Sequence, residues 1–256
     1  MLDNTSCRII RNDLRTVLPI VIIGTVLGCI VCVFINNIAI SSLSMNPILG
    51  ATLSQVYFTA TGILPTIIVG VGCSFMLFVL PRLREEDDYN RGTIKSHILT
   101  LAIAPLIVEV VILSAHLLTI WFKTGSFEGY SYIPVAYLGM YFLALFFASL
   151  VVFGAGVFRK AALGLGFAGI VSIWCLIAAM VAVMSCPLFI QMGAGDESLS
   201  SFYNVTITGL VDYPSLVSLS TPLPDYSCLL GLFAIFIIAI ALLLIGAYLM
   251  ARRTSS

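Results

Sequence analysis

The chain has 256 residues, of which 60% are hydrophobic and only 9% are charged, and its formal net charge is zero at pH 7. Soluble globular domains carry about 25% charged residues and about half apolar ones. Together with a mean hydropathy of +1.12, this composition excludes a soluble fold and indicates a polytopic membrane protein. The charges form a few clusters without a basic stripe, so no nucleic acid is expected as a partner. The seven cysteines include one C-x-x-C, Cys29 and Cys32 within an apolar run, but no second one to pair with it, so no metal site is expected.

The first predicted element is an amphipathic helix over residues 3–16 that lies in the membrane interface. Arg8, Arg11 and Arg15 recur at helical spacing, while Ile10 and Leu14 belong to a broad apolar side. A basic amphipathic helix ahead of a first span is typical of an interfacial helix. The alternative is an ordinary basic flank that only sets the topology.

Six apolar segments are long enough to cross a hydrocarbon core of about 30 Å, which takes about 20 residues of helix. We therefore predict an all-α protein with a single transmembrane domain over residues 1–256. The predicted spans are Val17–Phe34, Val56–Leu80, Ile98–Phe122, Ile133–Phe158, Ala161–Ile190 and Leu229–Ala251.

The distribution of Lys and Arg predicts the orientation of these spans. With six crossings, eleven of the twelve basic residues fall on one side of the membrane and only Lys123 falls on the other. The positive-inside rule makes the basic side cytoplasmic, together with both termini. We thus expect a multi-pass protein of the cell membrane. The eleven residues are Arg8, Arg11, Arg15, Arg82, Arg84, Arg91, Lys95, Arg159, Lys160, Arg252 and Arg253.

Residues 82–97, RLREEDDYNRGTIKSH, hold a third of the chain's charged residues in the predicted cytoplasmic loop between the second and third spans. One interpretation is a solvated loop whose charges anchor the neighbouring helix ends. The other is a docking element for a cytoplasmic partner. In a short helix here, the acidic residues Glu85, Glu86, Asp87 and Asp88 would precede the basic residues Arg91 and Lys95.

Two ionisable residues lie inside the third predicted span, Glu109 near mid-membrane and His116 seven residues later. Seven residues make nearly two full helical turns, so both side chains lie on one face. An ionisable side chain at that depth is costly and usually faces a cavity or a partner helix. The two residues are candidates for substrate contact or proton handling. The alternative is a hydrogen-bonded pair that fixes helix packing.

The longest predicted external connection is residues 187–228, which contain no Lys or Arg but many apolar residues. Such a segment is expected to pack against the outer rim of the membrane. Cys186 and Cys228 stand at the outer ends of the spans that bracket it. A disulfide between them would contribute roughly 3–4 kcal/mol in the chain-entropy model. Two free thiols are the alternative.

This plan resembles the six-span permease subunits of ATP-binding-cassette exporters, the class that includes bacterial drug, lantibiotic and polysaccharide exporters. In that family a cytoplasmic coupling helix often reads as acidic residues followed by Gly-Thr. Here the counterpart is the acidic run 85–88 followed by Gly92 and Thr93. The chain departs from the family at Leu101, where members commonly have proline, and at Glu109, where a basic residue is expected.

The resemblance implies a permease that moves an amphipathic or hydrophobic substrate outward across a bacterial plasma membrane. Residues 85–88, Arg91, Gly92 and Thr93 would then couple it to a separate ATPase subunit that holds ATP and magnesium. A second permease chain would complete the path, and membrane lipid would surround it. The chain has no G-x-x-x-x-G-K-[ST] phosphate loop, so we expect it to bind no cofactor and to be no enzyme itself.

Two other classes remain open from the sequence. A proton-coupled secondary transporter would use Glu109 and His116 as its proton relay, but such proteins typically show two similar halves. No convincing internal repeat is present in this chain. An intramembrane enzyme would need several polar residues at one depth, and only Glu109 and His116 offer themselves.

Overall fold

The computed structural model describes residues 4–43, 66–83, 91–128, 130, 133–158, 160–184 and 227–253. These residues are almost entirely helical and contain no strand, which confirms the predicted all-α class. The elements are α1 (Asn4–Leu43), η2 (Thr66–Val71), α3 (Gly72–Ser74), η3 (Phe75–Val79), α4 (Leu80–Leu83), α5 (Arg91–Thr124), α6 (Ile133–Val157), α7 (Ala161–Met184) and α11 (Ser227–Arg253). The segments η2, α3, η3 and α4 follow one another directly and form one rod of π- and α-helical turns.

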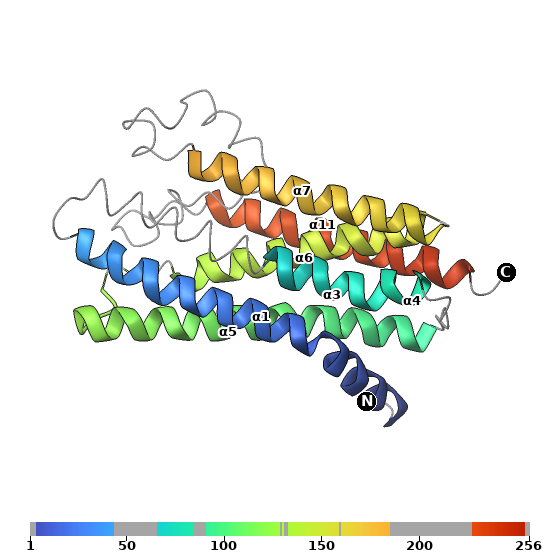
Figure 1. Ribbon diagram of the computed structural model, residues 1–256, viewed down its shortest axis with the longest axis horizontal. Coiled ribbons are helices and arrows are strands. Elements are labelled where there is room, and N and C mark those ends of the chain that lie inside the picture. The colour runs from blue at the N-terminus through green and yellow to red at the C-terminus, as the bar shows by residue number, and fades with distance from the viewer. Residues whose placement is uncertain are drawn as a thin grey trace.

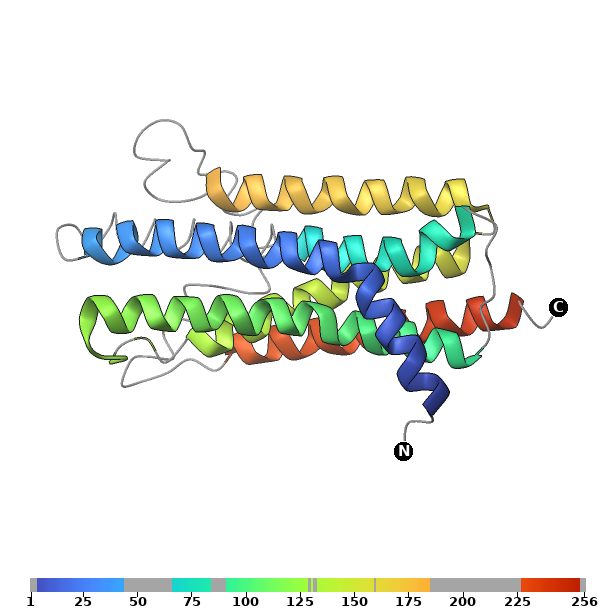
Figure 2. The same cartoon turned by 60° about the horizontal axis from the view of Figure 1, so that its bottom comes forward.

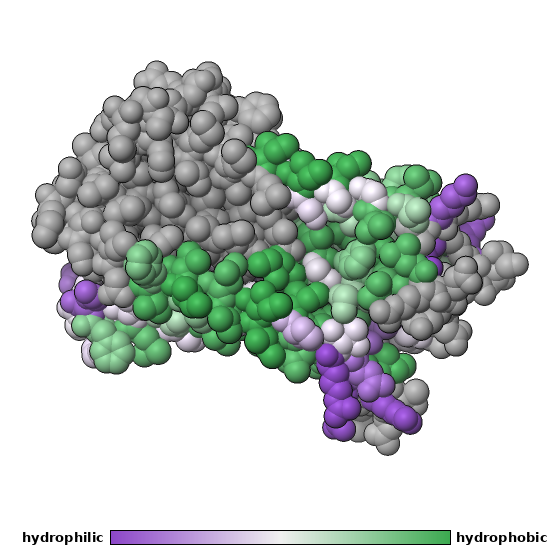
Figure 3. Space-filling model, in the orientation of Figure 1, coloured by the Kyte–Doolittle hydropathy of each residue, from purple (hydrophilic) through white to green (hydrophobic). Residues whose placement is uncertain are grey.

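Four helices are long and apolar enough to cross a membrane: residues 8–34, 92–124, 133–157 and 229–252. Two shorter apolar helices, residues 68–83 and 162–174, coincide with parts of the other two predicted spans. Figure 3 shows hydrophobic side chains along the length of one face and hydrophilic ones at the ends and on the protruding N-terminal part. This surface is that expected of a protein surrounded by lipid.

The helices run alongside one another in a single bundle (Figures 1 and 2). α1, α5 and α7 run in one direction along the bundle, and α6 and α11 run in the opposite direction. The start of α1 and the end of α11 consequently lie toward the same end. α6 is the central helix, because it contacts α5, η2, α7 and α11, and most of its side chains are buried.

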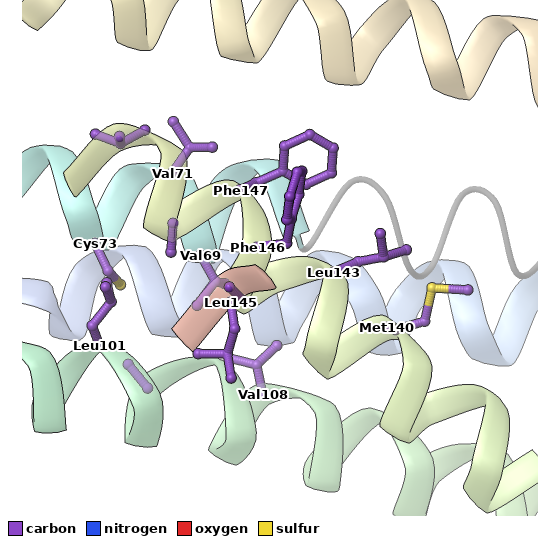
Figure 4. Packing of buried hydrophobic residues seen from close by; sticks show 14 of the residues in the cluster. Val69, Val71, Cys73, Leu101, Val108, Met140, Leu143, Leu145, Phe146 and Phe147 are labelled. Atoms are coloured by element: carbon purple, nitrogen blue, oxygen red, sulfur yellow. The ribbon is translucent and has the colours of Figure 1, made fainter. Parts of the chain in front are cut away.

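The core lies where α5, α6 and the rod of residues 66–83 meet. Figure 4 shows Val69, Cys73, Leu101, Val108 and Leu145 pointing toward one another from these three elements. All five side chains are almost completely buried. Because lipid tails are as apolar as these side chains, close packing rather than hydrophobic transfer has to hold membrane helices together.

The predicted interfacial helix and the first span form one continuous helix rather than two elements. α1 runs from Asn4 to Leu43, nine residues beyond the predicted end of the span at Phe34. Figures 1 and 2 show a bend in its dark-blue N-terminal part. Pro19 lies inside the helix, and proline removes one backbone hydrogen bond and clashes with the preceding turn, which kinks a helix. The kink angles the basic segment away from the bundle, as an interfacial segment requires.

The charged stretch 82–97 is likewise not a separate element. Its second half belongs to α5, which begins at Arg91 rather than at the predicted start of the third span, Ile98. Its first two residues end α4, and residues 84–90 lie outside the described part of the chain. Most of the predicted external loop 187–228 also lies outside it. So does Cys186, and with it the predicted disulfide to Cys228.

Two glycines allow α6 and α11 to approach closely. A Cβ atom added to Gly156 would lie 2.7 Å from the backbone oxygen of Gly246. One added to Gly246 would lie 2.9 Å from the oxygen of Val152. Real Cβ atoms do not come this near to backbone, so larger residues would force the helices apart. Small residues at such contacts are typical of membrane helix pairs.

We predict that Gly246→Ala destabilises the bundle by about 1–3 kcal/mol, the usual cost of overpacking a filled interface. Gly166→Ala on α7 is the matched control, because nothing lies within 4 Å of a Cβ atom there. The control should be neutral or slightly stabilising, since alanine favours helix over glycine by about 1 kcal/mol. Thermal unfolding in detergent measures both, and equal midpoints would contradict the prediction.

Candidate functional site

Buried polar side chains are concentrated on α5. Among the described residues, eight polar or charged residues are buried, and five of them belong to this helix. Polar groups inside a membrane bundle are costly and usually serve a substrate path, a proton path or a specific packing contact. The five residues are Ser96, His97, Thr100, Glu109 and His116.

Glu109 is the most unusual of these residues. It is 4% exposed, and its Oε2 atom has no hydrogen-bond partner among the described residues. Its neighbour Val108 points into the apolar cluster of Figure 4. An unpaired charge in such surroundings costs several kcal/mol, so a carboxyl group there favours binding a proton or a cationic ligand.

His116 is 3% exposed and finds a partner on α6 rather than on its own helix. Its Nδ1 atom lies 3.2 Å from the hydroxyl oxygen of Tyr137, and the two rings meet edge to face with their centroids 5.8 Å apart. The Oε2 atom of Glu109 has no hydrogen-bond partner among the described residues. The two residues share a face of α5, as their spacing predicts, but the contact with Tyr137 gives no support to the interpretation that they form a hydrogen-bonded pair with each other.

Arg82 fixes one end of the charged stretch to α6. Its guanidinium Nη1 donates a hydrogen bond to the backbone oxygen of Ala155 and a longer one, 3.4 Å, to that of Phe158. Ala155 belongs to the last turn of α6 and Phe158 directly follows the helix, so no further helical N–H is available to these carbonyls. A cation at a helix C-terminus also interacts favourably with the helix dipole. Arg82 therefore ties the loop to the central helix of the bundle.

A buried pair fixes the other end of this stretch to α1. The Nδ1 atom of His97 lies 2.7 Å from Oδ2 of Asp13. The two residues are only 9% and 7% exposed. The ring of His97 also meets that of Phe78 edge to face, with centroids 5.5 Å apart. The N-terminal segment, the rod of residues 66–83 and the first turns of α5 thus meet at one point.

The sequence interpretation missed Asp13, and it gave His97 no role. The signal was present in the helical spacing. Asp13 lies four residues before Val17, which is fully buried, so both belong to the inward side of α1. An acidic residue on the inward side of a basic amphipathic helix requires a partner. The sequence does not identify that partner, because the partner need not be the basic or histidine residue that is nearest along the chain.

The other residues of the predicted coupling element are only partly described. Glu85, Glu86, Asp87 and Asp88 lie outside the described residues. Arg91, Gly92 and Thr93 form the first turn of α5. Gly92 is exposed there and has no positive φ, a feature that Gly125 alone shows among the glycines described. Gly92 therefore occupies an ordinary helical position.

These features define an all-helical membrane protein whose buried polar groups line one helix and whose charged loop is anchored at both ends. Within the described residues, no three His, Cys, Asp or Glu side chains gather as a metal site would require. No protein-family model matches the chain, and no curated protein or solved structure matches it either.

We predict that Asp13 and His97 stabilise the fold as a pair. Removing one partner of a buried pair leaves the other uncompensated, so Asp13→Asn and His97→Gln should each lower the free energy of unfolding. A double-mutant cycle should give a coupling energy of about 0.5–3 kcal/mol. Glu128→Gln, an exposed acid elsewhere, is the matched control. Additive effects of the two substitutions would show that they do not interact.

We predict that Glu109 lowers the stability of the bundle. Glu109→Met removes a buried polar atom without a partner, so the free energy of unfolding should rise by about 1–3 kcal/mol. Val110→Ala, at the adjacent position that is 51% exposed, should change little. Unfolding in detergent measures both variants. A loss of stability in Glu109→Met would instead make Glu109 a packing residue.

Proposed function

We propose that the chain is the membrane-spanning permease subunit of an ATP-binding-cassette exporter. It moves an amphipathic or hydrophobic substrate outward with the energy of ATP hydrolysed by a separate ATPase subunit, which holds ATP and magnesium. A second permease chain, identical or homologous, completes the translocation path. The chain is not itself an enzyme under this proposal, and it resides in a bacterial plasma membrane with both termini in the cytoplasm.

The observation that carries the proposal is the double anchoring of the charged stretch. Arg82 binds the last turn of α6, and His97 binds Asp13 of α1. A partner that moves the intervening residues would therefore pull on α1, α5 and α6 together. A solvated loop needs no such anchors, whereas an element that transmits a cytoplasmic movement into the membrane does.

The continuity of α5 adds a second argument. Arg91–Thr124 is one helix of 34 residues, so its first two turns are a rigid extension of a membrane-crossing segment. Movement at Arg91 would reach Glu109 and His116 along this one helix, past Pro105, which removes one of its backbone hydrogen bonds. These two buried side chains are the groups we assign to the substrate path, since the Oε2 atom of Glu109 has no hydrogen-bond partner in the described part of the chain.

A proton-coupled secondary transporter is the second candidate, and Glu109 is the specific observation that favours it. A buried carboxyl group without a hydrogen-bond partner for Oε2 suits reversible proton binding. Under this alternative, Glu109→Gln abolishes transport driven by a proton gradient, and no ATPase is required. Under the exporter proposal, transport continues when the gradient is dissipated and stops when ATP is removed.

The exporter proposal predicts that reversing the charges of Glu85 and Glu86 together weakens docking of the ATPase. Single exposed ion pairs contribute only ~0.2–1 kcal/mol, but a double reversal to lysine replaces attraction by repulsion. The measurement is co-purification with the partner ATPase and ATP turnover after reconstitution in lipid vesicles. Both should fall several-fold.

A matched control sharpens this test. Glu128→Lys reverses an exposed acid beyond the far end of α5 and should leave docking unchanged. If the double reversal keeps both docking and ATP turnover at the wild-type level, residues 82–97 are a solvated loop and the proposal fails.

A further inference from the structure

A groove between α5 and α11 carries a chemistry that the proposed transport function does not use. It has a volume of about 390 Å³ and lies between the first turns of α5 and the last turns of α11. This is the end of the bundle where α1 begins and α11 ends (Figure 1). A pocket of 300–1,000 Å³ is the usual size for a small-molecule site.

The groove has a basic rim and apolar walls. Lys95 and Arg252 line it from the two helices, and both are exposed. Among the described residues, those that line it include no acidic one. The walls are formed by Ile98, Leu244 and Ala247. The groove is therefore amphipathic, because its rim is positively charged and its walls are apolar.

The groove opens to the surroundings of the bundle rather than to its interior. Leu244 and Tyr248 are 62% and 64% exposed, so a ligand can enter sideways from the bilayer. Tyrosine is enriched at the level of lipid headgroups, where its ring is apolar and its hydroxyl is wet. The position of Tyr248 beside Arg252 thus marks the boundary between the headgroup and hydrocarbon regions.

We propose that this groove binds one anionic phospholipid of the inner leaflet. Lys95 and Arg252 bind its phosphate, as basic pockets between membrane helices on the cytoplasmic side commonly do. One acyl chain lies along Ile98, Leu244 and Ala247. Only an anionic lipid uses both the basic rim and the apolar walls. A free phosphate does not contact the apolar walls, and a neutral lipid does not use the positive charges.

The test uses the full-length protein, delipidated in detergent and titrated with phosphatidylglycerol while native mass spectrometry counts the bound lipids. We expect one tightly bound phosphatidylglycerol and much weaker binding of phosphatidylcholine. Lys95→Gln combined with Arg252→Gln should weaken that one site roughly thirtyfold, since each basic residue near an anionic membrane contributes about 1 kcal/mol and tenfold in affinity equals 1.4 kcal/mol.

Two further variants separate the sources of binding. Ala247→Trp fills the groove but keeps both charges, so it should abolish phosphatidylglycerol binding. Lys123→Gln removes one lysine at the far end of α5 and should change nothing. Thermal unfolding confirms that each variant is folded, and a Leu244→Trp variant replaces Ala247→Trp if the latter is not.

Three results would overturn the proposal. The first is wild-type lipid affinity in the doubly neutralised variant. The second is equal binding of phosphatidylcholine. The third is inorganic phosphate competing at the same affinity while Ala247→Trp has no effect, which would make the groove a free-anion site. Because the assay contains neither ATPase nor transport substrate, its outcome is independent of the exporter proposal.

Discussion

Close contact between α6 and its neighbours is the constraint on which the rest of the structure depends. In a bilayer, burial of apolar surface gives little advantage to helix association, so dispersion contacts and small residues have to supply it. Gly70 faces the backbone of Ala144, where a Cβ atom would lie 2.6 Å from the oxygen. Gly156 faces Gly246 of α11. These approaches place α6 at the centre and determine where η2 and α11 can lie.

The central position of α6 also determines where polar side chains can be tolerated. α6 itself is almost purely apolar, with Ser149 as its one buried polar residue among those described. That hydroxyl donates to the backbone oxygen of Phe146 and so needs no other partner. α5 packs against α6 and carries five of the eight buried polar residues described. One of them, His116, obtains its partner Tyr137 from α6.

Local patterns predicted the helices but could not predict how they pair. The apolar run from Ile133 gave a span within one residue of the observed helix, Ile133–Val157, because 25 residues without a charged side chain have no alternative to a helix in a bilayer. The start of α5, at Arg91, and the end of α1, at Leu43, were placed less well. A change from polar to apolar residues along the sequence marks the boundary of the hydrocarbon region. A helix can continue past that boundary, so the change does not predict where the helix begins or ends.

The contact between Asp13 and His97 was beyond sequence reasoning for a different reason. The two residues are 84 positions apart, and their pairing depends on the angle that Pro19 gives to α1. The same applies to the groove between α5 and α11, since Lys95 and Arg252 share a site only after the bundle has formed. Charge patterns identify which residues need partners, whereas tertiary packing decides which partner each one finds.

The first turns of α5 connect these features to one another. Lys95 faces α11 at the groove, while His97, two residues later, faces α1 through Asp13. Successive helical residues are separated by about 100°, so residues two apart lie on nearly opposite sides of the helix. Any rotation of α5 about its axis would therefore alter both contacts at once. It would also act on Glu109 and His116, which lie further along the same helix, beyond Pro105. A ligand in the groove and a movement of the charged loop would act on one mechanical element, and the buried polar groups of the membrane region would respond to both.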